Sequence, residues 1–316
     1  MKARAVVFAE AGRLELRDVT LREPEADEVV VDTSFSSISS GTERLLFSGK
    51  LPGMPHLRYP LVPGCEAAGR VLSVGPDVTN VRAGDEVFVG GSMCYTDVAA
   101  AFGGQSSRLI KRAAQVVPLD GIPVAHAPLL ALAATALHGV LRLGDVSGRR
   151  VAVLGLGAVG QLAAAFLTAA GAETVVIDRS PDRLAASPGS EKVDVSTVPL
   201  EECVLAPVAF AIEATGDPAQ IARCARIVEP GGGILLLSYY DTLTTPFVDL
   251  FVKEATLLVS REWAPPDLPA ARDAVASGAV DLGPLASHVV PIERYEHAYQ
   301  TAFNDPSVLK VVLQWA

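Results

Sequence analysis

The stretch Val151-Ala-Val-Leu-Gly-Leu-Gly-Ala-Val-Gly-Gln161 joins a short apolar run to an alanine-rich one through Gly155, Gly157 and Gly160. A second apolar run, Thr174-Val-Val-Ile-Asp178, ends on an acid eighteen residues after Gly160. Strand, glycine turn, helix and acid-tipped strand in this order are the fingerprint of a dinucleotide-binding βαβ unit. Three glycines alone can close an empty turn, but here all four parts fall in register. We therefore predict a dinucleotide site.

Each part of this stretch has an expected contact with the cofactor. The glycines allow a tight turn and close approach of the pyrophosphate, and the helix N-terminus offers N–H groups to the phosphates. Asp178 would bind the ribose hydroxyls, which favours NAD because a carboxylate repels a 2′-phosphate, whereas Arg179 keeps NADP as an alternative. Thr215, Gly216, Ser238 and Tyr239 follow later strands, whose carboxyl ends face the ligand. The predicted cofactor residues are Gly155, Leu156, Gly157, Ala158, Val159, Gly160, Asp178, Arg179, Thr215, Gly216, Ser238, Tyr239 and, on the preceding helix, Thr135.

Strand and helix patterns alternate through the second half of the chain. Such alternation predicts an α/β fold, a Rossmann doubly wound parallel sheet with helices on both faces. We expect helices at 129–141, 158–170, 181–186 and 218–228, strands at 151–154, 174–178, 192–195, 208–212, 234–237 and 257–260, and a turn at 230–233. The first 120 residues differ, because short β-type runs there are punctuated by Gly and Pro, which predicts a mostly β domain.

Composition excludes several classes of protein. A length of 316 residues with 50% hydrophobic residues indicates two globular domains. The formal charge of −10 argues against a nucleic-acid partner and an anionic membrane surface. No secretory signal or apolar run of about twenty residues is present, so we expect no membrane insertion and a cytoplasmic protein. Four cysteines without a CxxC pair fit free thiols in a reducing compartment.

The order of parts resembles the medium-chain dehydrogenase/reductase superfamily along nearly the whole chain. The segments that carry the resemblance are Pro63-Gly-Cys-Glu-Ala-Ala-Gly-Arg-Val71, Val81-Arg-Ala-Gly-Asp-Glu-Val87, Ala133-Ala-Thr-Ala-Leu-His138 and the loop from Gly155 to Gly160. The resemblance implies a GroES-like, mostly β catalytic domain of residues 1–122 and 261–316. It also implies a Rossmann domain of residues 123–260, with cofactor and substrate meeting between the two.

Many members of that superfamily bind zinc, but this sequence departs at each ligand position. Ser40 lies in the segment where zinc members carry a cysteine, Cys65 stands where they carry a histidine, and Ala131 stands at the third position. Catalytic zinc needs three protein ligands and an open position. We therefore predict no metal site, and we expect Cys65 to be a buried structural cysteine.

A closer resemblance is to the bacteriochlorophyllide a dehydrogenases. It rests on Ser37-Ile-Ser-Ser-Gly-Thr-Glu-Arg-Leu-Leu-Phe-Ser-Gly49, Tyr59-Pro-Leu-Val-Pro-Gly-Cys-Glu-Ala-Ala-Gly69, Cys94-Tyr95, Phe102-Gly-Gly104 and Leu129-Leu-Ala-Leu-Ala-Ala-Thr-Ala136. That family oxidises the 3-(1-hydroxyethyl) substituent of a bacteriochlorophyllide to a 3-acetyl group and passes the hydride to NAD. The resemblance implies the same reaction here. Cys65 departs from the aromatic residue expected in that family, and this puts the substrate in doubt.

Alcohol oxidation needs a hydride acceptor, a base for the hydroxyl proton and a group that stabilises the alkoxide. Without zinc, side chains must supply the last two. The catalytic candidates are Ser39, Ser40, Thr42 and Glu43, with Glu43 as base, and Glu66, which could instead pair with a buried arginine. The substrate-binding candidates are His56, Tyr59, Cys65, Tyr95 and Phe102.

Three alternatives stay open. One is a zinc-free dehydrogenase of a sugar, cyclitol or natural-product alcohol, another is an enone or quinone reductase, and the third is a dinucleotide-binding protein without turnover. Superfamily members commonly dimerise through the last Rossmann strand, so the apolar run Leu257-Leu-Val259 leads us to expect a homodimer.

Overall fold

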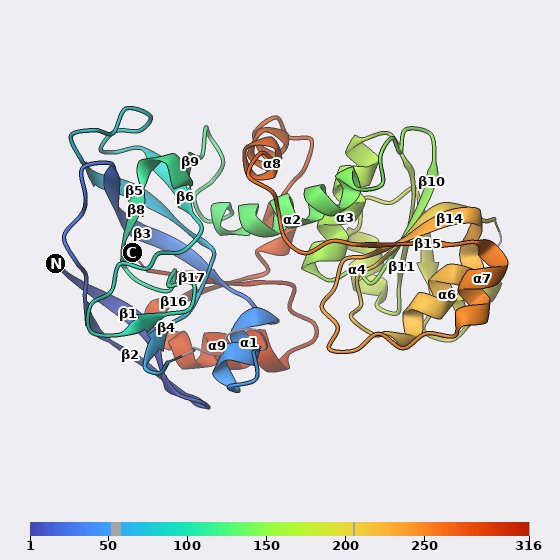
Figure 1. Cartoon of the computed structure of the whole chain (residues 1–316), viewed down its shortest axis with the longest axis horizontal. Coiled ribbons are helices and arrows are strands. Elements are labelled where there is room, and N and C mark those ends of the chain that lie inside the picture. The colour runs from blue at the N-terminus through green and yellow to red at the C-terminus, as the bar shows by residue number, and fades with distance from the viewer. Residues whose placement is uncertain (52–57, 205, 316) are drawn as a thin grey trace. The chain divides into compact units, whose positions relative to one another are not determined.

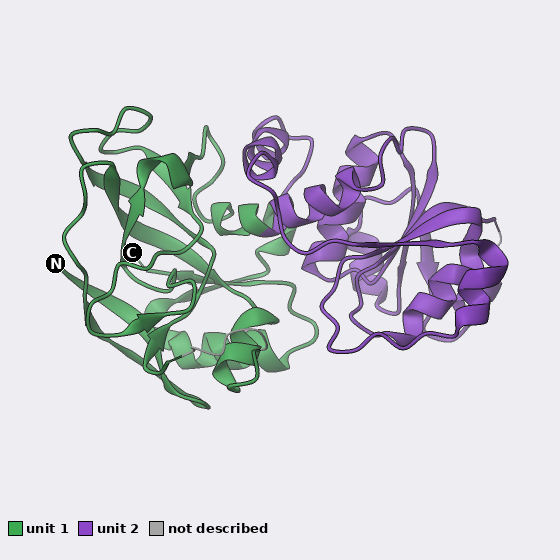
Figure 2. Ribbon diagram, in the orientation of Figure 1, with its two compact units in different colours: residues 1–131, 282–316 green, residues 132–281 purple. Residues whose placement is uncertain are grey.

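The chain folds into two compact units, coloured separately in Figure 2: residues 1–131 with 282–316 (unit 1), and residues 132–281 (unit 2). This computed structural model describes residues 1–51, 58–204 and 206–315. The boundaries differ from the expected breaks after residues 122 and 260. The short helix η2 (Ala127–Leu129) packs on strands of unit 1, and Asp267 is hydrogen-bonded to His138 within unit 2. These contacts assign residues 123–131 to unit 1 and 261–281 to unit 2.

Unit 2 is built on a six-stranded parallel sheet with the order β12-β11-β10-β13-β14-β15 (Figure 1). Its strands are β10 (Arg150–Leu154), β11 (Glu173–Asp178), β12 (Glu191–Asp194), β13 (Val208–Glu213), β14 (Val228–Leu236) and β15 (Thr256–Val259). The central strands are buried along nearly their whole length, as expected for a parallel sheet covered on both faces. The predicted doubly wound α/β sheet is confirmed.

Helices cover both faces of this sheet. The helices of this unit are α2 (Leu130–Leu141), whose first two residues are assigned to unit 1, α3 (Ala158–Ala169), α4 (Pro181–Ala186), α5 (Leu200–Cys203), α6 (Ala219–Ile227), α7 (Phe247–Lys253) and α8 (Asp267–Ala276). Ile221 and Cys224 of α6 pack with Ile234 and Leu236 of β14. Gly139 of α2 faces Leu235 and Leu237 instead. Because side chains alternate along a strand, α2 and α6 cover opposite faces.

The turn expected at Pro230–Gly233 was wrong, because these residues lie inside β14. Val228 pairs with Val208 of β13, and parallel pairing resumes at Gly233 opposite Phe210. Residues 229–232 therefore form an irregularity in a strand that is paired on both sides of it.

Unit 1 consists of two mostly antiparallel sheets. One has the order β2-β1-β4-β7, and the other has the order β16-β17-β3-β5-β6-β9 with β8 also paired to β3. The strands are β1 (Lys2–Glu10), β2 (Arg13–Thr20), β3 (Glu28–Ile38), β4 (Leu61–Val62), β5 (Ala67–Val74), β6 (Glu86–Val89), β7 (Ala99–Ala100), β8 (Arg108–Arg112), β9 (Val116–Pro118), β16 (His288–Pro291) and β17 (Val311–Gln314). Segments from both ends of the chain meet in this unit, since β17 pairs with β3. The expected mostly β fold is confirmed, and unit 1 consists of two separate segments of the chain.

Two α-helices of unit 1 lie beside these sheets, α1 (Thr42–Phe47) and α9 (Tyr295–Asn304). Short 3-10 helices accompany them: η1 (Ala113–Gln115), η2, η3 (Gly283–Leu285) and η4 (Ile292–Arg294). Leu46 of α1 and Tyr299 of α9 are fully buried in a common cluster with Phe8 of β1. This packing places α1 beside α9, and both carry polar side chains described below. Among the described residues, no helix is long and apolar enough to cross a membrane.

Candidate active site

The cofactor loop of unit 2 has the geometry that its glycines predict. Gly155 follows β10 with φ of +95°, and a Cβ there would lie 2.7 Å from the side chain of Thr215. At Gly160 a Cβ would lie 1.8 Å from the carbonyl oxygen of Gly155. Both positions therefore require glycine, one for the turn and one for packing α3 onto it.

The middle glycine is different, because a Cβ at Gly157 would meet no protein atom within 4 Å. Gly157 is also the N-cap of α3, and no side chain caps that end of the helix. The N–H groups of Ala158 and Val159 thus lie in the first turn of a twelve-residue helix. The space next to this turn, at Gly157, holds no protein atom. These features fit a pyrophosphate, which the N–H groups and the helix dipole would hold.

Asp178 lies where the dinucleotide fingerprint needs its acid. One carboxylate oxygen accepts a hydrogen bond of 2.7 Å from the Leu156 N–H, and the other accepts one of 2.9 Å from the Ser180 N–H. The side chain is only 8% exposed, so these bonds fix its orientation. Arg179 beside it is exposed. The structure therefore brings the loop and the acid together.

Two further loops begin at the carboxyl ends of strands in the same sheet. Gly216 follows β13, and its Cβ position lies 3.8 Å from the Cβ of Ser238, which follows β14. Tyr239 is 61% exposed, and Thr135 lies part-buried on α2. Glu213, the last residue of β13, contacts both loops and was not predicted. An acid that ends the buried apolar strand Val208–Ile212 was the available signal.

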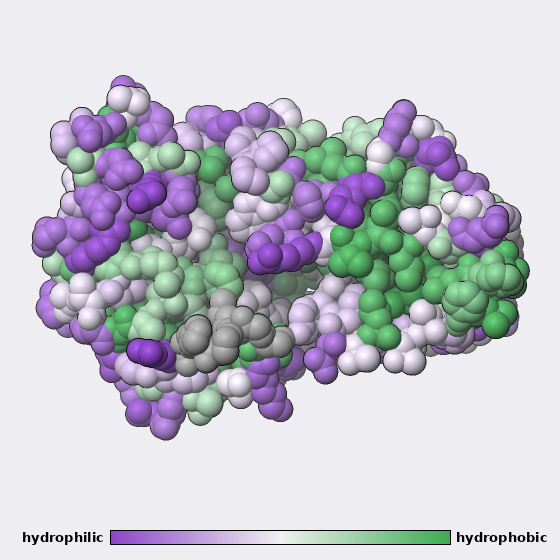
Figure 3. All heavy atoms as spheres, in the orientation of Figure 1, coloured by the Kyte–Doolittle hydropathy of each residue, from purple (hydrophilic) through white to green (hydrophobic). Residues whose placement is uncertain are grey.

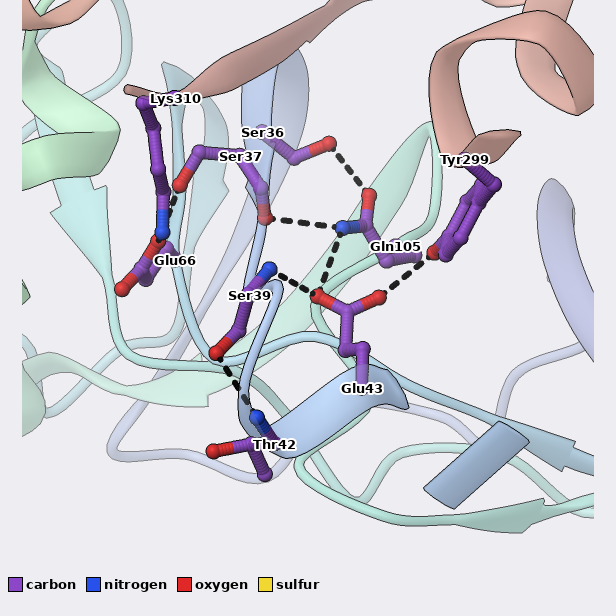
Figure 4. Close-up of polar contacts among 9 residues, drawn as sticks. All are labelled: Ser36, Ser37, Ser39, Thr42, Glu43, Glu66, Gln105, Tyr299 and Lys310. Atoms are coloured by element: carbon purple, nitrogen blue, oxygen red, sulfur yellow. Dashed lines mark hydrogen bonds and ion pairs between the residues drawn. The ribbon is translucent and has the colours of Figure 1, made fainter. Parts of the chain in front are cut away.

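In unit 1, Glu43 of α1 lies at the centre of a buried polar network (Figure 4). One carboxylate oxygen accepts hydrogen bonds from the Ser39 N–H at 2.9 Å and from Gln105 Nε2 at 3.3 Å. The other accepts a hydrogen bond of 2.6 Å from the Tyr299 hydroxyl. Burial raises the pKa of Glu43 to about 7, although these hydrogen bonds and the charge of Lys310 act in the opposite direction. The carboxyl group is therefore poised to change its charge near neutral pH.

The three predicted hydroxyl residues lie in the turn that leads into α1. Ser40 is exposed, and Ser39 and Thr42 are part-buried. The Ser39 Oγ accepts a hydrogen bond of 3.3 Å from the Thr42 N–H, which stabilises the start of the helix. The hydroxyls are thus more accessible than the Glu43 carboxylate, which is 1% exposed.

Glu66 is held in a buried ion pair. Its Oε2 lies 2.6 Å from Nζ of Lys310, and both side chains are at most 5% exposed. The Ser37 hydroxyl donates a hydrogen bond to the same oxygen. The alternative partner proposed for Glu66 was an arginine, but the cation is a lysine from the chain's C-terminal segment. No local pattern indicated Lys310, Gln105 or Tyr299, because each lies far along the chain from Glu43 and Glu66.

The residues at the zinc-ligand positions do not fit a metal. Cys65 is part-buried rather than buried, and burial together with the negative charge of Glu66 raises the pKa of its thiol. Ala131, at the third position, has no side-chain atom that could bind a metal. In the described ranges, no group of three or more His, Cys, Asp or Glu side chains is close enough to hold an ion. The residues at these positions therefore give zinc no role in the reaction considered below.

The aromatic candidates for substrate binding are anchored in unit 1. The Tyr59 hydroxyl donates to the Leu46 carbonyl, and the Tyr95 hydroxyl donates to the Gly103 carbonyl at 2.6 Å. Phe102 is part-buried and packs on the same cluster as Tyr59. Both tyrosine hydroxyls thus already have partners, which leaves the rings as the contact surface. His56 lies outside the described residues.

Comparison with known proteins identifies the family of this chain. The model for the alcohol dehydrogenase GroES-like domain matches residues 25–121, and the model for ketopantoate reductase PanE/ApbA matches residues 151–222. The chain is 37% identical to the 2-desacetyl-2-hydroxyethyl bacteriochlorophyllide A dehydrogenase of Cereibacter sphaeroides, covering 100% of this chain and 99% of the relative. It is 35% identical to the protein of the same name from Rhodobacter capsulatus, with the same coverage.

Solved structures share the fold. The crystal structure of a short chain alcohol dehydrogenase from Escherichia coli CFT073, complexed with NADH, superposes with a TM-score of 0.87 at 20% identity over 99% of both chains. The two full-length relatives decide the classification. The chain belongs to the medium-chain dehydrogenase/reductase superfamily of oxidoreductases and, within it, to the family of the bacteriochlorophyllide dehydrogenases.

Proposed function

We propose that this enzyme oxidises a secondary alcohol to a ketone with NAD and without zinc, and that its substrate is the 3-(1-hydroxyethyl) group of a bacteriochlorophyllide. The observation that carries the substrate is the 35–37% identity to two dehydrogenases of that name over the full chain. Membership of an oxidoreductase family disfavours the non-catalytic alternative. The four free thiols support a reducing, cytoplasmic location.

The choice of NAD rests on Asp178. Its buried carboxylate is fixed beside the glycine loop by Leu156 and Ser180, so it cannot swing away from a 2′-phosphate at low cost. The exposed Arg179 is free of that constraint and is the residue through which NADP would bind. We propose NAD as the working cofactor, because repulsion from a fixed acid opposes the phosphate.

The reaction breaks two bonds of the alcohol. NAD, when bound, accepts the hydride from the carbinol carbon, and the hydroxyl proton passes to the protein as the carbonyl forms. We assign the contacts with the reacting hydroxyl to Ser40 and Thr42, which are accessible, with Ser39 holding the turn. We propose Glu43, which contacts this segment through the Ser39 N–H, as the final proton acceptor, since its pKa of about 7 suits an acceptor at neutral pH. Glu66 forms a buried ion pair with Lys310, so we assign it a structural role and no part in proton transfer.

The enzyme is further proposed to act as a homodimer. The edge strand β15 exposes Leu257 and Val259, and α7 exposes Phe247, Val248, Phe251 and Val252, each of these four by at least 66%. Figure 3 shows apolar side chains gathered over this part of unit 2. An unpaired strand edge beside a contiguous apolar surface favours pairing with a second copy.

The substrate is tested by steady-state kinetics on three classes of compound. The purified enzyme is supplied with NAD and a 3-(1-hydroxyethyl) bacteriochlorophyllide, with NAD and a panel of sugar alcohols and cyclitols, or with NADH and an enone. We expect kcat/KM for the pigment to exceed that for the other classes by at least about 100-fold. A higher value for a polyol or an enone would move the enzyme to that alternative.

A further inference from the structure

Glu213 is a buried acid that lacks the usual compensation. It ends β13, it is 0% exposed, and among the described residues no cation contributes to its electrostatic environment. A buried carboxylate is normally paired with a positive charge, because removing it from water is costly. Burial accordingly raises the pKa of Glu213. If the residue at this strand end had only a structural role, an uncharged side chain would avoid the cost of burying a carboxylate.

The carboxylate is instead surrounded by neutral donors from two loops. Oε1 accepts a hydrogen bond of 2.8 Å from the Thr215 N–H and another from the Thr215 hydroxyl. Oε2 accepts one of 3.3 Å from the Gly216 N–H and one from the Tyr240 hydroxyl. Thr215 and Gly216 follow β13, whereas Tyr240 follows β14. One side chain therefore ties the two loops together.

These loops lie beside the start of the cofactor loop. The sheet order places β13 next to β10, and the Ala214 N–H donates to the Leu154 carbonyl at 2.9 Å. Thr215 packs so closely against Gly155 that no Cβ fits there. The strand order reverses between β10 and β13, and in open parallel sheets the ligand binds at such a point.

We propose that Glu213 is a positioning residue that holds the loops after β13 and β14 in the arrangement that binds the nicotinamide half of the cofactor. The proposal rests on the proposed dinucleotide function. Other ionisable groups near Glu213 are Asp217, whose negative charge raises the Glu213 pKa, and Cys224 of α6. Neither donates to the carboxylate among the described contacts, so the four neutral donors fix its position.

The test compares two ligands that differ in the nicotinamide. Binding of NADH and of ADP-ribose, which shares the adenosine and pyrophosphate but lacks the nicotinamide, is measured by calorimetry for the wild type, Glu213→Gln, Tyr240→Phe and the double variant. Glu213→Gln keeps one acceptor oxygen but replaces the other with an NH2 group, which cannot accept from the two donors on that side. The matched controls are Glu173→Gln, a half-exposed acid at the opposite end of the sheet, and Tyr295→Phe, whose hydroxyl bonds a surface glutamate at 3.2 Å.

We expect Glu213→Gln to weaken NADH binding by about tenfold and ADP-ribose binding by less than about twofold. Tyr240→Phe should weaken NADH binding by about threefold, and the double variant should match Glu213→Gln, because both changes act on the same loop contact. Unchanged NADH binding, or equal losses for the two ligands, would overturn the proposal. If Glu213→Gln fails to fold, Tyr240→Phe alone decides by the same comparison. Failure of the wild type to bind NADH would instead contradict the proposed function.

Discussion

Replacing Glu43 with glutamine removes a buried ionisable group while retaining an oxygen that can accept from Ser39 and Gln105. Burial raises the pKa of Glu43 from 4.5 to about 7 in the folded protein. The folded state therefore binds a proton more tightly than the unfolded state does. The stability contributed by that proton is fully present below pH 4.5 and is lost as the pH rises through 7.

The magnitude follows from these two values. A pKa that rises from 4.5 to about 7 corresponds to about 3 kcal/mol of free energy of unfolding, most of which is lost between pH 5 and pH 8. The glutamine variant has no such proton to lose. We therefore expect its free energy of unfolding, relative to the wild type, to increase by about 2 to 3 kcal/mol from pH 5 to pH 8.

Urea denaturation followed by tryptophan fluorescence measures this difference. The chain has two tryptophans, and Trp315 donates a hydrogen bond of 2.7 Å to Ser36, which in turn bonds Gln105 of the Glu43 network. A Trp263→Phe background leaves Trp315 as the reporter for unit 1. Glu86→Gln, a surface change in the same unit, is the matched control. A difference in the free energy of unfolding between Glu43→Gln and wild type that is the same at pH 5 and pH 8 would show that Glu43 does not titrate in this range.

Four further predictions follow from the site and the surface. Glu43→Gln should lower kcat by about 100-fold or more and abolish the rise of kcat near pH 7, as seen in a pH–rate profile; an unaltered profile would remove Glu43 from proton transfer. Asp178→Asn should weaken NADH binding by about tenfold and reduce the ratio of NADH affinity to NADPH affinity measured by calorimetry. An unchanged ratio would contradict the role of Asp178 in selecting NAD. Lys310→Met should destabilise the protein by about 3 to 5 kcal/mol in urea denaturation, because it leaves the Glu66 charge buried and unpaired, and adding Glu66→Gln should recover part of that loss; no recovery would argue against the ion pair. Val259→Lys should give a monomer in sedimentation velocity, and a dimer that survives would place the interface elsewhere.

The sequence predicted best those features whose residues lie close together in the chain. The loop from Gly155 to Gly160 and the acid at Asp178 lie within one βαβ unit, and the structure brings them together through the hydrogen bond from Leu156. The helices and strands around them were also predicted, since buried apolar runs and helical periodicity are local patterns. The turn at Pro230–Gly233 failed because pairing with β13 on both sides kept these glycines within the strand.

The candidate site in unit 1 could be predicted only in part. Glu43 and its hydroxyl neighbours are adjacent in the sequence, so they were found together. The partners that determine their chemistry are not: Tyr299 is 256 positions away from Glu43 and Gln105 is 62. Contacts formed by β17 and α9 packing against the first strands create this environment, and no single-sequence pattern specifies such long-range packing.

Turnover of metal-stripped enzyme distinguishes a zinc-free alcohol dehydrogenase from a zinc-dependent one. The protein is treated with a chelator, its zinc content is checked by elemental analysis, and NAD reduction is followed with a 3-(1-hydroxyethyl) bacteriochlorophyllide together with the visible absorption of the pigment. We expect formation of NADH with a matching shift of the pigment spectrum, at a rate that neither the chelator nor added zinc alters. Activity that disappears with the metal and returns with zinc, or a pigment that stays unchanged while the cofactor binds, would contradict the proposed zinc-free reaction.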